Sequence, residues 1–187
     1  MTIVRSREDY YETGLDVLAD LGYGGFKLAE ICKRLGVTTG SFYHRFASWP
    51  AYAHELARYW VEHHTTRISE SLRAEPDPRI RIEWLTELTR TSSYRTEAAI
   101  RTWSAVDPEV HALLTAVDQE RFDVTFEAIF EILHDVRQAQ LFASWATYLR
   151  IGYQQALIPY DPEARNWALD RILEVFYSDR FAGAPDG

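Results

Sequence analysis

The sequence predicts an all-α protein of about nine helices. Apolar residues recur at intervals of three and four along the chain, and no run of useful length alternates apolar with polar residues as a half-buried strand would. The seven prolines lie between these periodic segments, where helices begin or end. With 187 residues, 47% of them apolar, the chain can bury a sizeable core in one or two domains.

The first two helices are expected at about residues 6–21 and 27–35. Gly22 fits the C-terminal stop of the first helix. The second carries apolar residues at positions i, i+3, i+4 and i+7, namely Leu28, Ile31, Cys32 and Leu35. Four residues on one stripe predict an amphipathic helix with one buried face.

A short third helix is expected at about residues 38–45, after a tight turn. Gly36 suits the left-handed residue of that turn, and the hydroxyl of Thr38 can cap the helix that follows. Phe42 and Phe46 are four residues apart, so both can point toward the core. The remaining side chains of this helix are then left facing outward.

Gly40 stands in the middle of this third helix, beside the outward residues Thr39, Tyr43 and His44. A glycine inside a helix costs about 1 kcal/mol relative to alanine, so its presence suggests that another molecule must approach the backbone closely. A helix, a tight turn and a second helix with a small outer face are what a reader of the DNA major groove needs. The alternative is a surface helix that tolerates glycine.

The distribution of charge permits such a DNA-facing surface. The net charge is −8, but residues 1–60 carry seven cations and seven acids, so the whole surplus of negative charge lies beyond residue 60. Within the neutral segment, acids crowd residues 8–20 and most cations come later. This asymmetry allows DNA binding at the N-terminal end.

The run GYGGFKLAEICKRLGVTTGSFYHRF resembles the DNA-binding segment of TetR-type transcriptional repressors. Ten positions match the family pattern at the correct spacing: Gly22, Tyr23, Ile31, Gly36, Val37, Thr38, Gly40, Phe42, Tyr43 and Phe46. The resemblance is strong over residues 10–50 and looser beyond them. It implies a helix-turn-helix domain at 1–48, a regulatory domain at 49–187, and a homodimeric repressor that leaves a near-palindromic double-stranded operator when a small-molecule effector binds.

The same resemblance implies which residues contact DNA. They are Lys27, Thr38, Thr39, Gly40, Ser41, Tyr43 and His44. Tyr43 would bond a phosphate through its hydroxyl, and Gly40 would allow close approach. Two positions depart from the pattern: Phe26 precedes the second helix where relatives carry a Ser or Thr cap, and Trp49 opens the fourth where they carry lysine. We therefore expect the fold to hold and the operator affinity or footprint to differ.

Six further helices are expected, at about residues 49–73, 79–95, 97–105, 108–134, 136–157 and 162–179. The resemblance implies that the last two form a dimer interface, with candidate residues Leu141, Leu149, Gly152, Ile172 and Phe176. Five aromatic residues are candidates for the effector pocket: Trp84, Tyr94, Trp103, Trp145 and Tyr148. The alternative for each aromatic residue is a place in the core.

Other chemistries find little support in the sequence. The single cysteine, Cys32, excludes an intramolecular disulfide, and the lack of a long apolar run predicts a cytoplasmic protein without a membrane partner. No histidine pair has the spacing of a zinc site, and no catalytic motif stands in its expected context, so we expect no metal, no cofactor and no enzyme. Control by a protein partner, activation in place of repression, and a helical carrier or enzyme stay open as alternatives.

Overall fold

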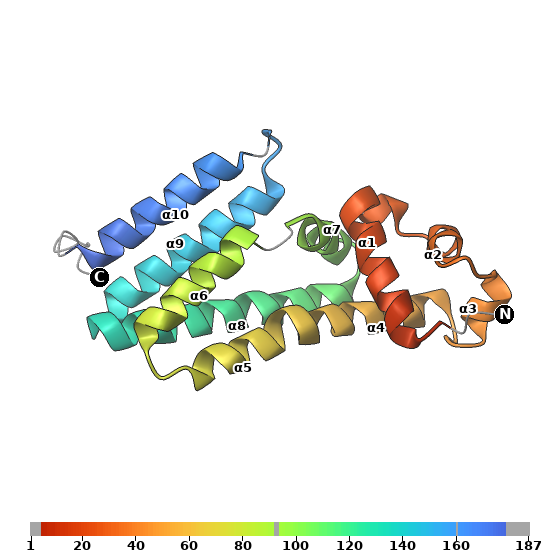
Figure 1. The fold of residues 1–187 in the computed structure, drawn as a ribbon, viewed down its shortest axis with the longest axis horizontal. Coiled ribbons are helices and arrows are strands. Elements are labelled where there is room, and N and C mark those ends of the chain that lie inside the picture. The colour runs from red at the N-terminus through yellow and green to blue at the C-terminus, as the bar shows by residue number, and fades with distance from the viewer. Residues whose placement is uncertain (1–4, 92–93, 160, 179–187) are drawn as a thin grey trace. The chain divides into compact units, whose positions relative to one another are not determined.

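The structure is a computed structural model that describes residues 5–91, 94–159 and 161–178. All regular elements in those ranges are helical (Figure 1). They are α1 (Arg7–Gly25), α2 (Leu28–Leu35), α3 (Thr39–Tyr43), α4 (Trp49–Val61), η1 (Glu62–Thr66), α5 (Arg67–Ala74), α6 (Pro78–Thr91), α7 (Tyr94–Ser104), α8 (Pro108–Leu133), α9 (Val136–Gln155) and α10 (Pro162–Tyr177). The predicted all-α class is confirmed.

Several helix boundaries differ from the prediction. The break predicted between residues 95 and 97 lies inside α7, which begins at Tyr94. The first helix does not stop at Gly22: that residue is a kink with φ 65°, and a further turn carries α1 to Gly25. The fourth helix is not uniform, because a π-helical turn, η1, separates α4 from α5. Residues 92–93, inside the predicted helix 79–95, and residue 179, the predicted end of the last helix, lie outside the described residues.

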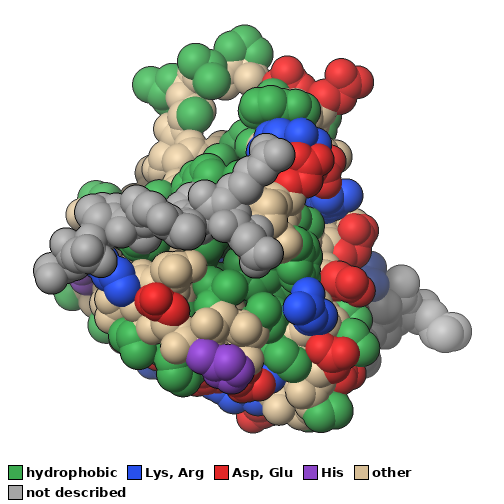
Figure 2. Space-filling view, turned by 90° about the vertical axis from the view of Figure 1, so that its left-hand side faces the viewer, with side chains coloured by type: hydrophobic (Ala, Val, Ile, Leu, Met, Phe, Trp, Pro, Cys, Tyr) green, Lys and Arg blue, Asp and Glu red, His purple; other side chains and the backbone are tan. Residues whose placement is uncertain are grey.

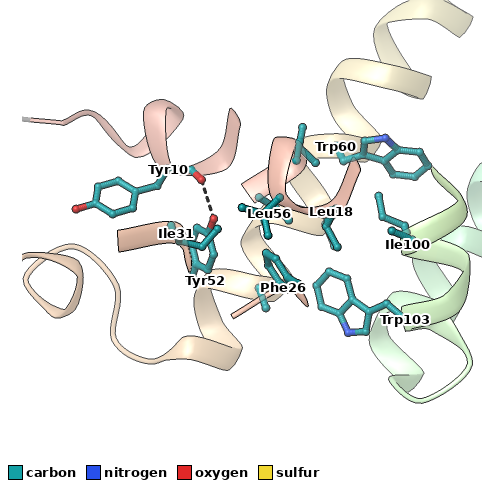
Figure 3. Close-up of a cluster of buried hydrophobic side chains, with 14 of the residues drawn as sticks. Tyr10, Leu18, Phe26, Ile31, Tyr52, Leu56, Trp60, Ile100 and Trp103 are labelled. Atoms are coloured by element: carbon teal, nitrogen blue, oxygen red, sulfur yellow. Dashed lines mark hydrogen bonds between the residues drawn. The ribbon is translucent and has the colours of Figure 1, made fainter. Parts of the chain in front are cut away.

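The chain forms two compact units, of which the first comprises residues 1–67 and 93–117. Within it α1 packs against α7, α2 and α4. Figure 3 shows Leu18, Phe26, Leu56 and Trp103 converging from these helices, all buried. Tyr52 is also buried, and its hydroxyl donates a 2.7 Å hydrogen bond to the backbone carbonyl of Tyr10, which links α4 to α1.

The second unit comprises residues 68–92 and 118–187. Its core includes Ile82 of α6, Ile129 of α8, Phe142 of α9 and Phe176 of α10. The rings of Phe142 and Phe176 meet edge to face with centroids 5.3 Å apart. Among the described residues no helix is long and apolar enough to cross a membrane, and no cluster of His, Cys, Asp and Glu could hold a metal ion.

Candidate nucleic-acid interface

Helix α2 and the turn after it set the direction of α3. The buried stripe of α2 includes Ile31 and Leu35, which fix one face of the helix on the core. Gly36 then adopts φ 67°, and the amide of Val37 donates to the carbonyl of Cys32 at 3.0 Å. This closes the helix as predicted, because a left-handed residue lets the next amides satisfy the last carbonyls.

Helix α3 is capped at its start and anchored from below. The side chain of Thr38 accepts a 3.1 Å hydrogen bond from the amide of Ser41, which is the predicted cap. Phe42 and Phe46 are buried, and their rings lie 5.9 and 5.4 Å from the ring of Tyr10 in edge-to-face contact. Two aromatic anchors therefore fix the inner face of a helix of only five residues.

The outer face of α3 is exposed. It consists of Thr38, Thr39, Gly40, Ser41, Tyr43 and His44, the residues predicted to face outward or contact DNA. The hydroxyls of Thr38 and Ser41 lie 3.0 Å apart. Tyr43 is 52% exposed, and in the described part of the chain its hydroxyl has no hydrogen-bond partner. The face thus presents hydroxyl groups and an imidazole around Gly40, where the backbone carries no side chain.

The packing of the protein itself does not require glycine at position 40. A Cβ there would meet only Thr38 Oγ1, at the ordinary contact distance of 3.6 Å. Gly14 on α1 is different, because a Cβ would collide with the side chains of Leu56 and Tyr52. Gly14 is therefore explained by internal packing, whereas the cost of Gly40 to the helix has no internal compensation.

Some cations of this helix-turn-helix segment have acidic partners, and others have none among the described residues. Arg34 is paired with Asp20 at 2.7 Å and with Glu30 at 3.0 Å. Lys27 is exposed, and neither it nor Arg45 forms an ion pair within the described ranges. Sequence reasoning missed Arg45 as a candidate, although its position at the end of the predicted third helix was a usable signal.

The two departures from the family pattern contact each other. Phe26 and Trp49 have ring centroids 4.8 Å apart, and Trp49 also lies 5.3 Å from Tyr52. Lys27, at the N-cap of α2, makes no side-chain capping bond, as its residue type predicts. Phe26 and Trp49 thus stabilise each other by aromatic packing, while the N-cap of α2 has no side-chain bond.

Helix α4 is fastened to the start of α8 by a polar cluster. His54 Nε2 lies 2.9 Å from Asp107 Oδ2, and His54 Nδ1 lies 3.0 Å from Glu109 Oε2. Asp107 also accepts from the indole of Trp103 at 3.2 Å and from the amide of Val110 at 3.3 Å. Although burial raises the pKa of Asp107, the bonds from His54 and Val110 outweigh it and hold that pKa below its usual value.

The five effector-pocket candidates are divided between the two units. Trp103 is only 2% exposed and packs against Tyr23 and Phe26 with centroids 5.6 and 5.5 Å away, so it is a core residue, the alternative that the sequence left open. Trp84, Trp145 and Tyr148 belong to the second unit and are 44%, 41% and 71% exposed. Tyr94 is half-buried at the start of α7 in the first unit.

The five dimer-interface candidates differ in how far they are buried inside their own unit. Phe176 is 7% exposed and Ile172 packs against the same core, so both are engaged inside their own unit. Leu141 and Leu149 are half-buried, and a Cβ at Gly152 would meet nothing within 4 Å. Large apolar side chains that sequence reasoning did not select are more exposed: Trp167, Leu157 and Ile158. Figure 2, which views the side where α10 ends, shows hydrophobic side chains exposed among charged ones.

The comparisons agree with the resemblance seen in the sequence. Residues 11–48 match the family model described as bacterial regulatory proteins, tetR family. Among curated proteins no relative matches the chain.

Solved structures share the fold over most of the chain. A transcriptional regulator from Rhodococcus sp. Rha1 is 21% identical, with 92% of this chain and 96% of that chain covered and a TM-score of 0.70. A regulator from Saccharomonospora viridis in complex with choline is 18% identical, with 90% and 95% covered and a TM-score of 0.73. The reduced form of NemR from E. coli is 20% identical, with 91% and 95% covered and a TM-score of 0.67. At these identities the likeness shows the fold.

Proposed function

We propose that this chain, with its TetR-type helix-turn-helix segment and TetR-type fold, is a homodimeric transcriptional repressor that binds a near-palindromic operator and is released by a small molecule. The observation that carries the proposal is the outer face of α3. It is small, polar and exposed, and its central Gly40 could hold a Cβ without any clash inside the protein. A close external surface such as the DNA major groove explains that glycine.

The roles of the face follow from its chemistry. Thr38, Thr39 and Ser41 would bond base edges or phosphates at the start of the recognition helix, and His44 would lie at the groove. The free hydroxyl of Tyr43 and the unpaired Lys27 would bond phosphates. Phosphate contacts set the position of the helix, and base contacts set the sequence that it prefers.

Dimerisation would place two such helices about one turn of DNA apart, ~34–36 Å, so that each reads one half-site. Exposed apolar surface supports an interface on α9 and α10, since Trp167 on α10 is 65% exposed and Leu157 and Ile158, just after α9, are 103% and 77% exposed. Leu141, Leu149 and Gly152 would complete this surface, and the open space at Gly152 allows a close approach of helices.

A small-molecule effector is supported by the fold and by the aromatic residues of the second unit. The similar regulator from Saccharomonospora viridis was solved with choline, so this fold can hold a small ligand. Trp84, Trp145 and Tyr148 are exposed aromatic side chains of the kind that line ligand sites. Binding would favour a dimer whose two recognition helices no longer match the spacing of the groove.

The experiment that tests the proposal is selection of bound fragments from the source genome by the purified dimer at about 50 and 200 mM salt. We expect a near-palindromic site, with a steep loss of binding between the two salt concentrations because phosphate contacts release counterions. Gly40→Leu serves as the control and should enrich nothing. A folded, dimeric protein that enriches no site would overturn the proposal.

A further inference from the structure

Arg7 occupies the first position of α1 and reaches the far end of the recognition helix α3. Its Nη1 donates a 2.7 Å hydrogen bond to the backbone carbonyl of Arg45, two residues beyond the end of α3. Its guanidinium carbon lies 4.5 Å from the centre of the Phe46 ring. The same side chain therefore satisfies a carbonyl after α3 and covers one of the two aromatic anchors below it.

The guanidinium is held from its other side by α1 and α4. Arg7 Nε donates to the hydroxyl of Tyr11 at 3.2 Å, and Nη2 pairs with the carboxylate of Glu55 on α4. The Tyr11 hydroxyl donates to the same Glu55 oxygen at 2.7 Å. The ring of Tyr11 lies 5.9 Å from Phe46. Three separate nitrogens thus point in three fixed directions, which the planar fork of arginine permits and the single ammonium of lysine does not.

A second arginine makes a related contact one helix earlier. Arg5 Nε donates to the carbonyl of Leu35, the last residue of α2, at 3.3 Å. Cations at the carboxyl ends of helices are favourable because the unpaired carbonyls carry partial negative charge. Both helices of the helix-turn-helix thus have an arginine of the N-terminal segment at their carboxyl ends.

We propose that Arg7, held by Glu55 and Tyr11, is a positioning residue that fixes the carboxyl end of α3 on the protein, and that it does not act as a phosphate contact. This inference rests on the proposed function, because it concerns how the recognition helix is presented. A cation at the edge of a DNA-binding segment would ordinarily be assigned to the phosphates by its charge. The geometry assigns Arg7 to the protein, since its charge is opposed by Glu55 and one hydrogen of each nitrogen is already used.

Glu55→Gln distinguishes a positioning role of Arg7 from a phosphate contact, because the two roles predict opposite changes in operator affinity. The change removes a negative charge beside the helix-turn-helix segment, so by charge alone operator binding should become tighter. If Arg7 positions α3, the loss of its ionic partner loosens the helix, and specific binding should fall about ten-fold, the equivalent of one hydrogen bond to a charged group. Non-specific DNA binding should stay equal to the wild type or rise.

Glu30→Gln is the matched control. Glu30 pairs with Arg34 at 3.0 Å and Lys33 at 3.5 Å on its own helix, and among the described residues none of its ionic partners lies on α3. Its side chain is 24% exposed, compared with 33% for Glu55. This variant also removes one negative charge, and we expect its specific binding to be equal to the wild type or tighter.

Two substitutions of Arg7 add a salt-dependence test. Arg7→Lys keeps the charge and Arg7→Gln removes it, yet both lose the fork, so we expect similar losses of specific affinity and an unchanged slope of log K against log salt. A phosphate contact would instead survive in Arg7→Lys, and Arg7→Gln would lower the slope by about 0.9. In combination with Glu55→Gln, Arg7→Lys should cost less than the sum of the two single changes.

Hydrogen exchange in the free protein gives a readout that needs no DNA. The amides of His44 and Phe46 donate to the carbonyls of Gly40 and Phe42 at 3.1 Å each. In Glu55→Gln these amides should exchange faster while those of α2 do not change, with circular dichroism showing an intact fold. Unchanged exchange, or operator binding that tightens in Glu55→Gln as in Glu30→Gln, would overturn the inference alone. A wild-type protein that binds no operator would overturn the proposed function and with it this role.

Discussion

Replacement of Gly40 by alanine and by leucine tests whether the outer face of α3 approaches DNA. Gly40 lies inside α3 without a positive φ, and an added Cβ would meet Thr38 Oγ1 at 3.6 Å, an ordinary contact. Because alanine loses less conformational entropy than glycine in a helix, Gly40→Ala should raise the free energy of unfolding by about 0.5–1 kcal/mol. The leucine side chain would project into solvent, so that variant should be no less stable than the wild type.

Operator affinity should fall in both variants, although their stability is equal to that of the wild type or higher. A methyl group on the outer face holds the helix away from the groove, and each well-formed base contact is worth about 1–3 kcal/mol. The loss of one such contact in Gly40→Ala would weaken operator binding about ten- to one-hundred-fold, since 1.4 kcal/mol corresponds to a factor of ten. Gly40→Leu should abolish specific binding.

The assay pairs anisotropy titration of a labelled operator at fixed salt with urea unfolding of the same variants. Gly24→Ala is the control, because a Cβ at Gly24 in α1 meets nothing within 4 Å. It should leave operator affinity as in the wild type. Retained affinity in Gly40→Leu would refute the explanation of the glycine, and so would a parallel fall of stability and binding, which would indicate a folding defect.

Three further predictions concern residues of the first unit. Tyr43→Phe should weaken binding equally across operator variants, because a phosphate contact carries no sequence preference, and a change at one base position would contradict that role. Trp49→Lys should steepen the salt dependence by about 0.9 through one added phosphate contact. It should also lower stability by about 0.5–1.5 kcal/mol, since Trp49 loses its ring contact with Phe26, and both effects are measurable on one sample. Asp107→Asn should destabilise the protein at neutral pH but not in strong acid. Burial raises the pKa of Asp107, but its bonds with His54 and Val110 together lower it by more, so the folded-state pKa lies below the usual value. The stability that ionised Asp107 contributes is therefore present above the unfolded pKa of about 3.9 and is lost as the pH falls through the folded value. Urea unfolding from pH ~7 down to ~2 measures the difference, and a constant difference would refute the ionic role.

Local sequence signals predicted the helix-turn-helix segment well. The stripe of α2, the left-handed Gly36, the Thr38 cap and the inward Phe42 each depend on neighbours within a few residues, and each is confirmed. The end of α1 was wrong because Gly22 stops one helical run while another turn follows at once. A glycine marks a break in the backbone without showing what comes next.

Burial by distant partners could not be read from the sequence. Trp103 and Phe176 lie on apolar faces, and periodicity shows that a face is covered without showing by what. The structure covers Trp103 with Tyr23 and Phe26 in the first unit, and Phe176 with Phe142 in the second. The π-helical turn η1 was equally hidden, because it changes the hydrogen-bond register of the backbone while the apolar spacing around it still fits a helix.

The first unit also shows why the DNA-binding segment cannot be considered separately from the helices that follow it. The domain boundary at residue 48 stays a prediction, and it is placed where the resemblance to the helix-turn-helix pattern ends. Yet Tyr52, Leu56, Ile100 and Trp103, all 2% exposed or less, lie beyond it and share one core with α1 and α2. At about 1.5–3 kcal/mol for each buried side chain, their removal would cost as much as the whole stability of a small domain.

Phe26 links α7 to α4 within this shared core. Its ring lies 5.5 Å from Trp103 on α7 and 4.8 Å from Trp49 on α4, and Trp49 lies 6.1 Å from Phe42 on α3. Because close-packed side chains transmit displacement, a repacking of α7 would alter the support beneath α3 through these rings. The two aromatic departures from the family pattern therefore have a common physical consequence: they connect α7 to the inner face of the helix that we propose reads DNA.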